Sequence, residues 1–272
     1  MNIKYKGRTR KIEKGLTVRE ALAEEIKNSE YEVIGCLYNN DYRNLETQIE
    51  EGANIELIDI SSKEGMKIYV RTIVYIMGKA FESLYPKEKL MVEYQLGNAM
   101  YCKCDNIKIT KEFTEKLKQK MQEIIEKDLP IKKVEMTRKE AQKFYDETDT
   151  SKGRLQFDFE ENDPIYMYYC EKYYNYCFGT LANRTGVIKI FDVVKYANGF
   201  LIRYPSSKEP TKMPEFQETK KLAWALEEFE KIHSVLDVLT VYKLNKAIEE
   251  DRIKDVIMLA EALHEKKIAN IA

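Results

Sequence analysis

The sequence predicts an α+β protein, in which helices and strands are segregated along the chain instead of alternating. Three observations predict this class. The first 60 residues contain short alternating apolar patterns around one helical stretch. Residues 66–204 contain helical patterns followed by a run of strands, and everything after Glu218 has a helical pattern. Segregation of this kind favours antiparallel sheets.

Four stretches near the N-terminus have strand-like composition: 2–6, 8–12, Val33–Tyr38 and Ile55–Ile60. Gly7 separates the first two as a hairpin turn, and residues 39–41 predict another turn. Thr17 is a candidate helix N-cap, and Glu20 completes a capping box. The order β-β-α-β-β is typical of a ubiquitin-like β-grasp domain, which we expect over residues 1–62.

A helix predicted to begin at Met66 opens the second domain, and its main stretch is Tyr69–Pro86. An apolar stripe recurs at intervals of three and four residues: Ile73, Ile76, Met77, Ala80 and Leu84. Arg71, Tyr75 and Lys79 are spaced four apart and share the opposite face. Such a face is either the solvated back of a helix or one wall of a polar site.

The rest of this domain, expected over residues 63–207, mixes capped helices with strands. Thr110 is a candidate N-cap, Thr137 and Glu140 form a candidate capping box, and 146–154 predicts a loop. Seven stretches predict strands: Met91–Tyr94, Ala99–Cys104, Ile131–Glu135, Tyr166–Tyr169, Tyr173–Phe178, Val187–Tyr196 and Phe200–Tyr204. Tyrosines cluster between residues 166 and 176, which indicates a half-buried sheet surface.

Pro205–Pro214 predicts a linker, and residues 208–272 are expected to form this linker and a helical tail. Helices are predicted at 218–232, 240–249 and 251 to the end. The last one stops without a C-cap glycine or proline, so we expect the natural chain to continue.

The composition excludes some classes of protein. With 45 basic and 46 acidic side chains, no global field draws the chain to nucleic acid or to a membrane surface. No apolar run approaches the roughly 20 residues that span a bilayer. Five cysteines, an odd number, do not indicate a disulfide framework, and the expected compartment is a reducing cytoplasm.

The first domain resembles the TGS domain at the N-terminus of threonyl-tRNA synthetases. Lys14–Thr17 matches the turn from hairpin to helix in that family, and Ile55–Ile60 matches its last strand. The resemblance implies a module that binds partners or regulates, without chemistry of its own.

The second domain is similar to the editing-type second domain of threonyl- and alanyl-tRNA synthetases. The resemblance lies in an ordered series of short matches: Leu84–Pro86, Tyr101, Glu123, Lys127, Lys133, Glu140-Ala141, Glu171–Tyr173, Cys177-x-Gly179 and Phe191…Gly199-Phe200…Arg203. In editing enzymes a His-x-x-x-His helix and a Cys-x-x-x-His strand make a metal and water site that hydrolyses a mischarged ester.

The resemblance places Arg71, Tyr75, Cys177 and Leu181 at those four positions. Only the cysteine is retained. Arginine keeps its proton and does not ligate a metal, and leucine has no donor atom. We therefore expect no metal and no catalytic residue in this chain.

The complete layout is similar to that of bacterial nucleoside kinases of the uridine kinase type, over essentially all 272 residues. The matches are Gly65–Tyr69, Phe191-Asp192 with Gly199-Phe200, Arg203–Pro205 and Glu261–Ala269. This resemblance implies a C-terminal kinase domain of the same polypeptide, which would use ATP and magnesium to phosphorylate a nucleoside. No P-loop lies in this chain, because its one Gly-Lys pair, Gly78-Lys79, falls inside a helix and precedes alanine. We expect no cofactor here.

Five residues are candidates for a vestigial pocket inherited from the editing site: Arg71, Tyr75, Lys79, Cys177 and Arg203. Arg71 suits such a pocket to an anion, for example a phosphate or carboxylate. The alternative is that Arg71 pairs with a carboxylate such as Glu82 or Asp192.

Two further groups are weaker candidates. Cys102, Cys104, Cys170 and Cys177 offer four thiols, but Cys-x-Cys is not the usual zinc-knuckle spacing, so buried reduced thiols are favoured. His233 and His264 lie in the helical tail, where a lone histidine usually serves packing or solvation.

Three functions remain open. The leading one is a non-catalytic regulatory or ligand-recognition region of a nucleoside kinase, with a nucleotide or RNA as ligand and no membrane partner. The alternatives are a trans-editing hydrolase of mischarged tRNA and a tRNA-binding fragment related to threonyl-tRNA synthetase. Salt-dependent tRNA affinity would indicate the last of these.

Overall fold

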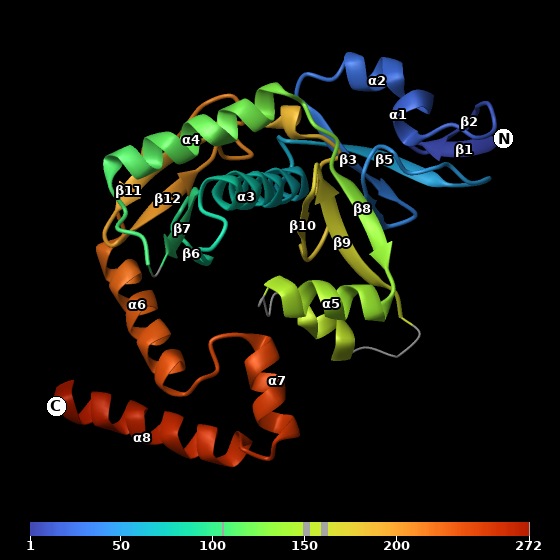
Figure 1. The fold of residues 1–272 in the computed structure, drawn as a ribbon. Coiled ribbons are helices and arrows are strands. Elements are labelled where there is room, and N and C mark those ends of the chain that lie inside the picture. The colour runs from blue at the N-terminus through green and yellow to red at the C-terminus, as the bar shows by residue number, and fades with distance from the viewer. Residues whose placement is uncertain (105, 149–152, 159–162, 272) are drawn as a thin grey trace. The chain divides into compact units, whose positions relative to one another are not determined.

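The computed structural model describes residues 1–104, 106–148, 153–158 and 163–271 (Figure 1). Helices are interspersed with pairs of strands, and among the described residues all registered strand pairs but one are antiparallel, which confirms the α+β class. The chain forms two compact units, one of Met1–Val134 with Tyr166–Phe216 and one of Glu135–Ile165 with Gln217–Ala272. The division into three domains at residues 62 and 207 stays a prediction.

The first unit begins with a five-stranded sheet of order β2-β1-β5-β3-β4. Its strands are β1 (Asn2–Tyr5), β2 (Arg8–Lys11), β3 (Val33–Tyr38), β4 (Asp41–Arg43) and β5 (Asn54–Asp59). β1 and β5 are parallel, and the other neighbours are antiparallel. The Thr17–Glu20 capping box is confirmed. The predicted helix is two short ones, α1 (Val18–Ala21) and α2 (Ala23–Lys27), separated at Leu22, whose φ is −119°.

The long helix α3 (Lys63–Leu84) begins before the predicted position at Met66. The reason is local, because the Ser62 hydroxyl accepts from the Gly65 amide at 3.0 Å and caps the helix earlier. A Cβ on Gly65 would lie 1.9 Å from the Asp59 carbonyl oxygen, so only glycine fits there. The predicted apolar stripe of α3 faces the largest hydrophobic core of the unit.

A four-stranded antiparallel sheet of order β11-β12-β7-β6 lies against α3 and α4 (Figure 1). The elements are β6 (Leu90–Gln95), β7 (Ala99–Cys104), α4 (Lys111–Glu126), β11 (Asp192–Tyr196) and β12 (Gly199–Arg203). The Thr110 N-cap is confirmed, since its side chain accepts from the Phe113 amide. Phe113 and Leu117 of α4 pack with Phe200 of β12 in the shared core.

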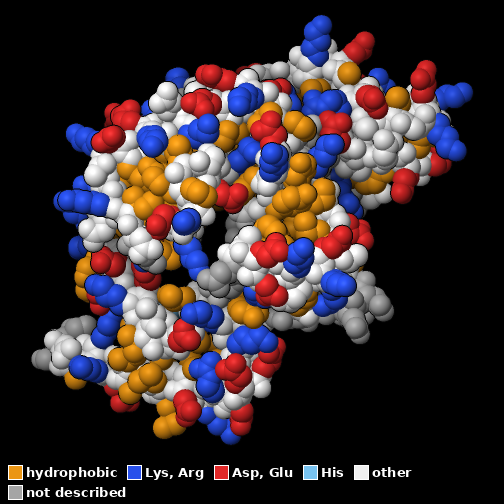
Figure 2. Space-filling model, in the orientation of Figure 1, with side chains coloured by type: hydrophobic (Ala, Val, Ile, Leu, Met, Phe, Trp, Pro, Cys, Tyr) orange, Lys and Arg blue, Asp and Glu red, His pale blue; other side chains and the backbone are white. Residues whose placement is uncertain are grey.

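A three-stranded sheet of order β10-β9-β8 lies mostly in the first unit. Its strands are β8 (Lys132–Met136), β9 (Ile165–Cys170) and β10 (Tyr173–Asn175). Tyr168 and Tyr173 are buried, whereas Tyr166, Tyr169 and Tyr174 are half-buried. Figure 2 shows hydrophobic side chains gathered over β9. The prediction of a half-buried, tyrosine-rich sheet surface is therefore confirmed.

The predicted strand at Val187–Tyr196 is wrong in its first part. A short 3₁₀ helix, η2 (Thr185–Val187), comes first, and β11 begins only at Asp192. The Tyr69 hydroxyl accepts from the amides of Lys189 and Ile190 and donates to the Ile190 carbonyl. These backbone groups bond to a side chain instead of a neighbouring strand.

Two smaller boundaries also differ. The strand predicted at Tyr173–Phe178 ends at Asn175, because the Tyr168 hydroxyl donates to the Gly179 carbonyl and Gly179 has a φ of +90°. Asp41, predicted in a turn, begins β4. The other predicted strands agree with the structure to within one residue at each end.

The second unit is helical: α5 (Arg138–Thr148), η1 (Arg154–Asp158), α6 (Lys220–Val235), α7 (Val241–Glu249) and α8 (Ile253–Ile271). The Thr137–Glu140 capping box is confirmed. The predicted loop at 146–154 lies partly outside the described residues, and its first three residues belong to α5. Among the described residues, no helix combines the length and the apolar character that a membrane crossing requires.

Candidate functional site

Tyr75 of α3 lies inside the protein, at 1% exposure. Its ring meets those of Tyr168 and Tyr173 edge-on, with centroids 6.3 and 5.1 Å away, and its hydroxyl donates to the Tyr173 carbonyl at 3.2 Å. Burial, together with the nearby Cys170 thiol, raises the pKa of the Tyr75 hydroxyl. Tyr75 therefore lies neither on a solvated helix back nor in an open polar site.

Lys79, one turn further along α3, binds the turn between β9 and β10. Its ammonium donates to the carbonyl oxygens of Cys170 at 2.8 Å and Glu171 at 3.0 Å, and its side chain is only 11% exposed. Glu171 and Lys172 both have positive φ, 42° and 67°, as a type I′ turn requires. Lys79 therefore fixes this turn to the helix.

Arg71 lies against Gly179, where an added Cβ would be 3.0 Å from the guanidinium carbon. No ion pair or hydrogen bond joins the Arg71 side chain to another described residue. Asp192, which we expected as one alternative partner, binds Lys118 at 2.7 Å instead. Burial raises the pKa of the neighbouring Tyr168 hydroxyl, and the charge of Arg71 opposes that rise. Among the described residues, Arg71 therefore pairs with neither of the expected carboxylates and lies beside Gly179 and Tyr168 instead.

Leu181 and Tyr75 fill the space where the resemblance places metal ligands. Leu181 is fully buried, in an apolar cluster with Tyr75 and Tyr168, and Cys177 is half-buried at the edge of that cluster. Within the described ranges, no group of three or more His, Cys, Asp or Glu side chains is placed to hold a metal ion. The fold therefore brings these positions together around hydrophobic packing.

Arg203 does not join the other four candidate residues. It lies on β12, where its guanidinium donates to the Pro214 carbonyl and stands 5.8 Å from the Phe216 ring. Cys102 is buried against the Met77 sulfur. The buried thiols favoured for Cys102, Cys104 and Cys170 are confirmed, whereas Cys177, the fourth cysteine of that prediction, is only half-buried. His233 and His264 lie in α6 and α8, in the helical unit.

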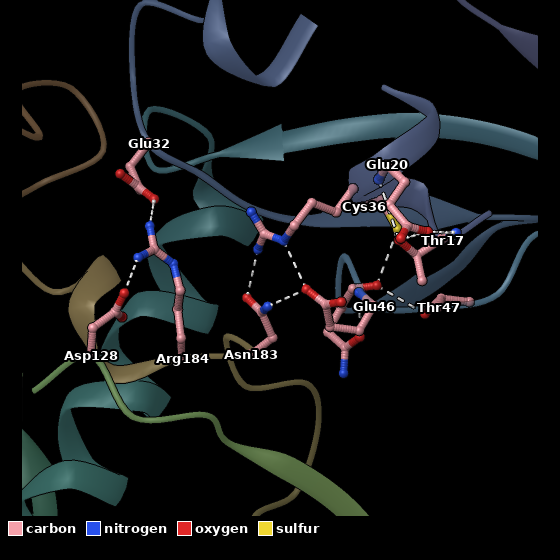
Figure 3. Close-up of polar contacts among 11 residues, drawn as sticks. Thr17, Glu20, Glu32, Cys36, Glu46, Thr47, Asp128, Asn183 and Arg184 are labelled. Carbon is pink, nitrogen blue, oxygen red and sulfur yellow. Dashed lines mark hydrogen bonds and ion pairs between the residues drawn. The ribbon is translucent and has the colours of Figure 1, made fainter. Parts of the chain in front are cut away.

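The segment Thr180–Arg184 connects this region to the first sheet (Figure 3). The Asn183 amide donates to Glu46 at 2.6 Å, and the Arg184 guanidinium donates to both Glu32 and Asp128. On its other side the segment contacts the cluster, since the Leu181 amide donates to the Tyr168 hydroxyl at 3.3 Å. Apart from Leu181, which the resemblance singled out, sequence reasoning missed this segment, because it has no helical or strand pattern.

Next to Arg71 the chain exposes an aromatic and basic surface. Phe178 is 82% exposed, and the Thr180 hydroxyl donates to the Tyr42 carbonyl at 2.8 Å, which places this loop beside β4. Lys133 lies 4.0 Å from the Tyr166 ring centroid. Partial desolvation and the nearby Arg43 cation lower the pKa of Lys133. We call Phe178, Tyr42, Arg43, Arg71 and Lys133 the Phe178 surface; sequence reasoning had placed Phe178 in a strand.

The chain is similar in sequence to threonine–tRNA ligases. It is 28% identical over 196 residues, 71% of the chain, to that of Caldanaerobacter subterraneus subsp. tengcongensis. It is 28% identical over 203 residues, 74% of the chain, to that of Clostridium tetani, and 28% over 208 residues to that of Thermotoga petrophila. The chain spans only 30 to 32% of the length of these relatives. No protein-family model matches it.

These similarities support a region like the N-terminal part of threonine–tRNA ligases. They lend no support to the nucleoside kinase that the sequence analysis put first, and they favour its stated alternative, a tRNA-related fragment.

Proposed function

We propose that this chain is a non-catalytic RNA-recognition region, related to the N-terminal part of threonine–tRNA ligases, on an editing-type scaffold without its metal site. The observation that carries the proposal is the contact of Arg71, which has no ion pair among the described residues, with the loop that exposes Phe178. By their name, the relatives are ligases that act on tRNA, and this chain combines its similarity to them with a surface suited to RNA.

The Phe178 surface has the two features that single-stranded nucleic acids require. Exposed aromatic rings stack on bases, and Phe178 and Tyr42 are 82% and 45% exposed. Cations neutralise phosphates: Arg71 and Lys133 supply them on neighbouring elements, and Arg43 supplies a third that is paired with Asp41 at 2.7 Å. The overall charge of −1 adds nothing, so affinity would come from this local patch.

Hydrolysis of a mischarged ester by the editing mechanism needs a metal-bound water. Tyr75 and Leu181 occupy that volume with a ring and an isobutyl group, and burial raises the pKa of the Tyr75 hydroxyl, so it stays protonated. These features support the non-catalytic part of the proposal.

The first 62 residues would be a TGS-like β-grasp module within this region. In support, the short helices α1 and α2 pack on the five-stranded sheet. Its first and last strands in chain order, β1 and β5, are parallel neighbours inside the sheet. The kinase domain, its ATP and magnesium, and the cytoplasmic location stay predictions. Sequencing the natural gene around this region tests the kinase domain, which a strand followed by Gly-x-x-x-x-Gly-Lys-Ser/Thr would indicate.

The test measures the affinity of the whole chain for tRNA and for a short single-stranded RNA at several salt concentrations. We expect binding that weakens with salt, and about tenfold weaker binding for Phe178→Ala, the loss of one stacked base. Val92→Ala on β6, also an exposed apolar side chain, is the matched control. Equal affinities for the two variants would overturn the RNA assignment.

A second measurement separates the alternative function. Mischarged tRNA is incubated with the chain, with and without zinc, and ester hydrolysis is followed. We expect only the background rate. Zinc-dependent turnover would contradict the non-catalytic reading and establish a trans-editing hydrolase.

A further inference from the structure

A cavity of about 310 Å³ opens between the ends of α3 and α4 and the β9–β10 turn. This volume is at the lower end of the range for small-molecule sites. Four lysines and two glutamates line it, so its charge is positive in a chain whose total charge is −1. The cavity is distinct from the Phe178 surface, with which it shares no lining residue.

Two of the four lysines are already engaged. Lys79 donates to the carbonyls of Cys170 and Glu171, and Lys120 binds Glu123 at 2.9 Å. The side chains of Lys127 and Lys172, in contrast, make no ion pair or hydrogen bond with any described residue. Lys172 sits on the type I′ turn that Lys79 fixes to α3, so its backbone position is set.

Lysines near helix ends can simply complement the helix dipole. Here one carbonyl near the end of each helix already has a side-chain partner. The Ile124 carbonyl accepts from the Thr185 hydroxyl at 2.8 Å, and the Ala80 carbonyl accepts from the Ser83 hydroxyl at 2.8 Å. The side chains of Lys127 and Lys172 donate to no helix carbonyl of the described residues.

The floor of the cavity is apolar. Ile124 and Tyr173 are buried there, and Leu129 is half-buried beside them. The Tyr173 hydroxyl accepts from the Asn175 amide at 2.5 Å, so the ring presents its hydrocarbon surface. A ligand that suits this cavity has an anionic group for the two lysines and an apolar or aromatic body for the floor.

We propose that this cavity binds a phosphorylated small molecule, with its phosphate between Lys127 and Lys172 and its organic part on Ile124, Leu129 and Tyr173. A phosphate monoester carries close to two negative charges at neutral pH, which two ammonium groups neutralise. Lysine is a common phosphate ligand as a point charge. A carboxylate would leave one of the two cations without a partner.

Glu82 lowers the affinity of the cavity for anions. Its carboxylate lines the same wall and makes no ion pair or hydrogen bond of its own with described residues. As a negative charge it weakens the binding of any anion in the cavity. Glu82→Gln therefore increases the affinity several-fold, whereas loss of the two lysines decreases it.

The test titrates the whole chain with AMP, adenosine and inorganic phosphate by calorimetry. We expect AMP to bind and adenosine not to bind at millimolar concentration. We expect the double variant Lys127→Ala/Lys172→Ala to bind AMP at least tenfold more weakly than the parent chain. The control, Lys139→Ala/Lys254→Ala, removes two exposed lysines of the helical unit and leaves the affinity unchanged. Tighter binding to Glu82→Gln supports the site even where the double variant is unstable.

Two outcomes would overturn the proposal. One is equal AMP affinity in the lysine variant and its control. The other is that short RNA binds and AMP does not, and that both Phe178→Ala and the lysine variant weaken the RNA binding. This result would assign the lysines to the RNA surface. Loss of RNA binding with retained AMP binding would contradict only the proposed function.

Discussion

The hydroxyl of Tyr75, in the middle of α3, donates a hydrogen bond to the backbone carbonyl of Tyr173, the first residue of β10, at 3.2 Å. The bond lies in a buried cluster, so its loss removes a hydrogen bond that water does not replace. Tyr75→Phe should therefore lower the free energy of unfolding by about 1–2 kcal/mol. Urea denaturation of the variant and the parent chain measures the difference.

Tyr42→Phe is the matched control, because the Tyr42 ring is 45% exposed and its hydroxyl bonds to no described residue. We expect a change within about 0.5 kcal/mol for this surface substitution. Equal unfolding free energies for the two variants would contradict the burial of the Tyr75 bond.

Leu181 packs into the buried cluster with Tyr75 and Tyr168, at a position where the resemblance has a histidine. Because it is fully buried, Leu181→Ala should lower the free energy of unfolding by about 2–5 kcal/mol. Val92→Ala, on a partly exposed strand, should cost far less. A stability loss at Leu181 no larger than that at Val92 would show that the loop, and not the cluster, holds this residue.

Cys177 differs from the other thiols in accessibility. Burial raises the pKa of Cys36 to about 12, against the opposing charge of Arg43, and it also raises the pKa of Cys102 and Cys170. Since the thiolate is the reactive form, a thiol reagent at pH 7.5 should modify Cys177 first.

The measurement follows absorbance as a disulfide reagent reacts with the folded chain. Cys177→Ser should remove the fast phase and leave the slow one, which reflects opening of the core. A fast phase of unchanged amplitude in this variant would place another cysteine at the surface.

Glu82 makes stability depend on pH. Partial desolvation raises the pKa of its carboxyl above the ordinary value of 4.5, and the Lys79 cation opposes that rise. Ionisation of Glu82 therefore destabilises the folded state. The stability that this carboxyl contributes is fully present below its ordinary pKa and is lost as the pH rises through its raised pKa in the folded chain.

Glu82→Gln removes this dependence. Its unfolding free energy should match that of the parent chain at low pH and exceed it above the raised pKa, with the difference growing between the two values. Denaturation curves from pH 4 to pH 8 test this. A difference that stays constant across the range would mean that Glu82 titrates alike in the folded and unfolded chains.

Local signals in the sequence were sufficient for many features of the fold. Thr17, Thr110 and Thr137 were identified as caps because a cap depends only on residues a few positions away. The burial of Tyr75 could not be predicted, since its partners lie on β9 and β10, about 95 residues later. The same is true of Tyr69, whose bonds to residues 189 and 190 replace a predicted strand.

The candidate site shows the same limit. The spacing of Arg71, Tyr75 and Lys79 placed all three on one helix face, but spacing does not say what covers a face. Lys79 was a candidate cation for a ligand, and the structure uses two of its donors on carbonyls. Arg203 was included through the resemblance, although β12 holds it among other contacts.

The segment Thr180–Arg184 has bonds on both of its sides. Thr180, Asn183 and Arg184 bond outward to the first sheet, and the amides of Leu181 and Ala182 bond inward to Tyr168 and Thr72. A single residue inserted before Ala182 would move this apolar residue to the place where Asn183 is bonded to Glu46. The length of this loop should therefore be less tolerant of insertion than its irregular backbone implies, whereas ordinary surface loops accept such changes readily.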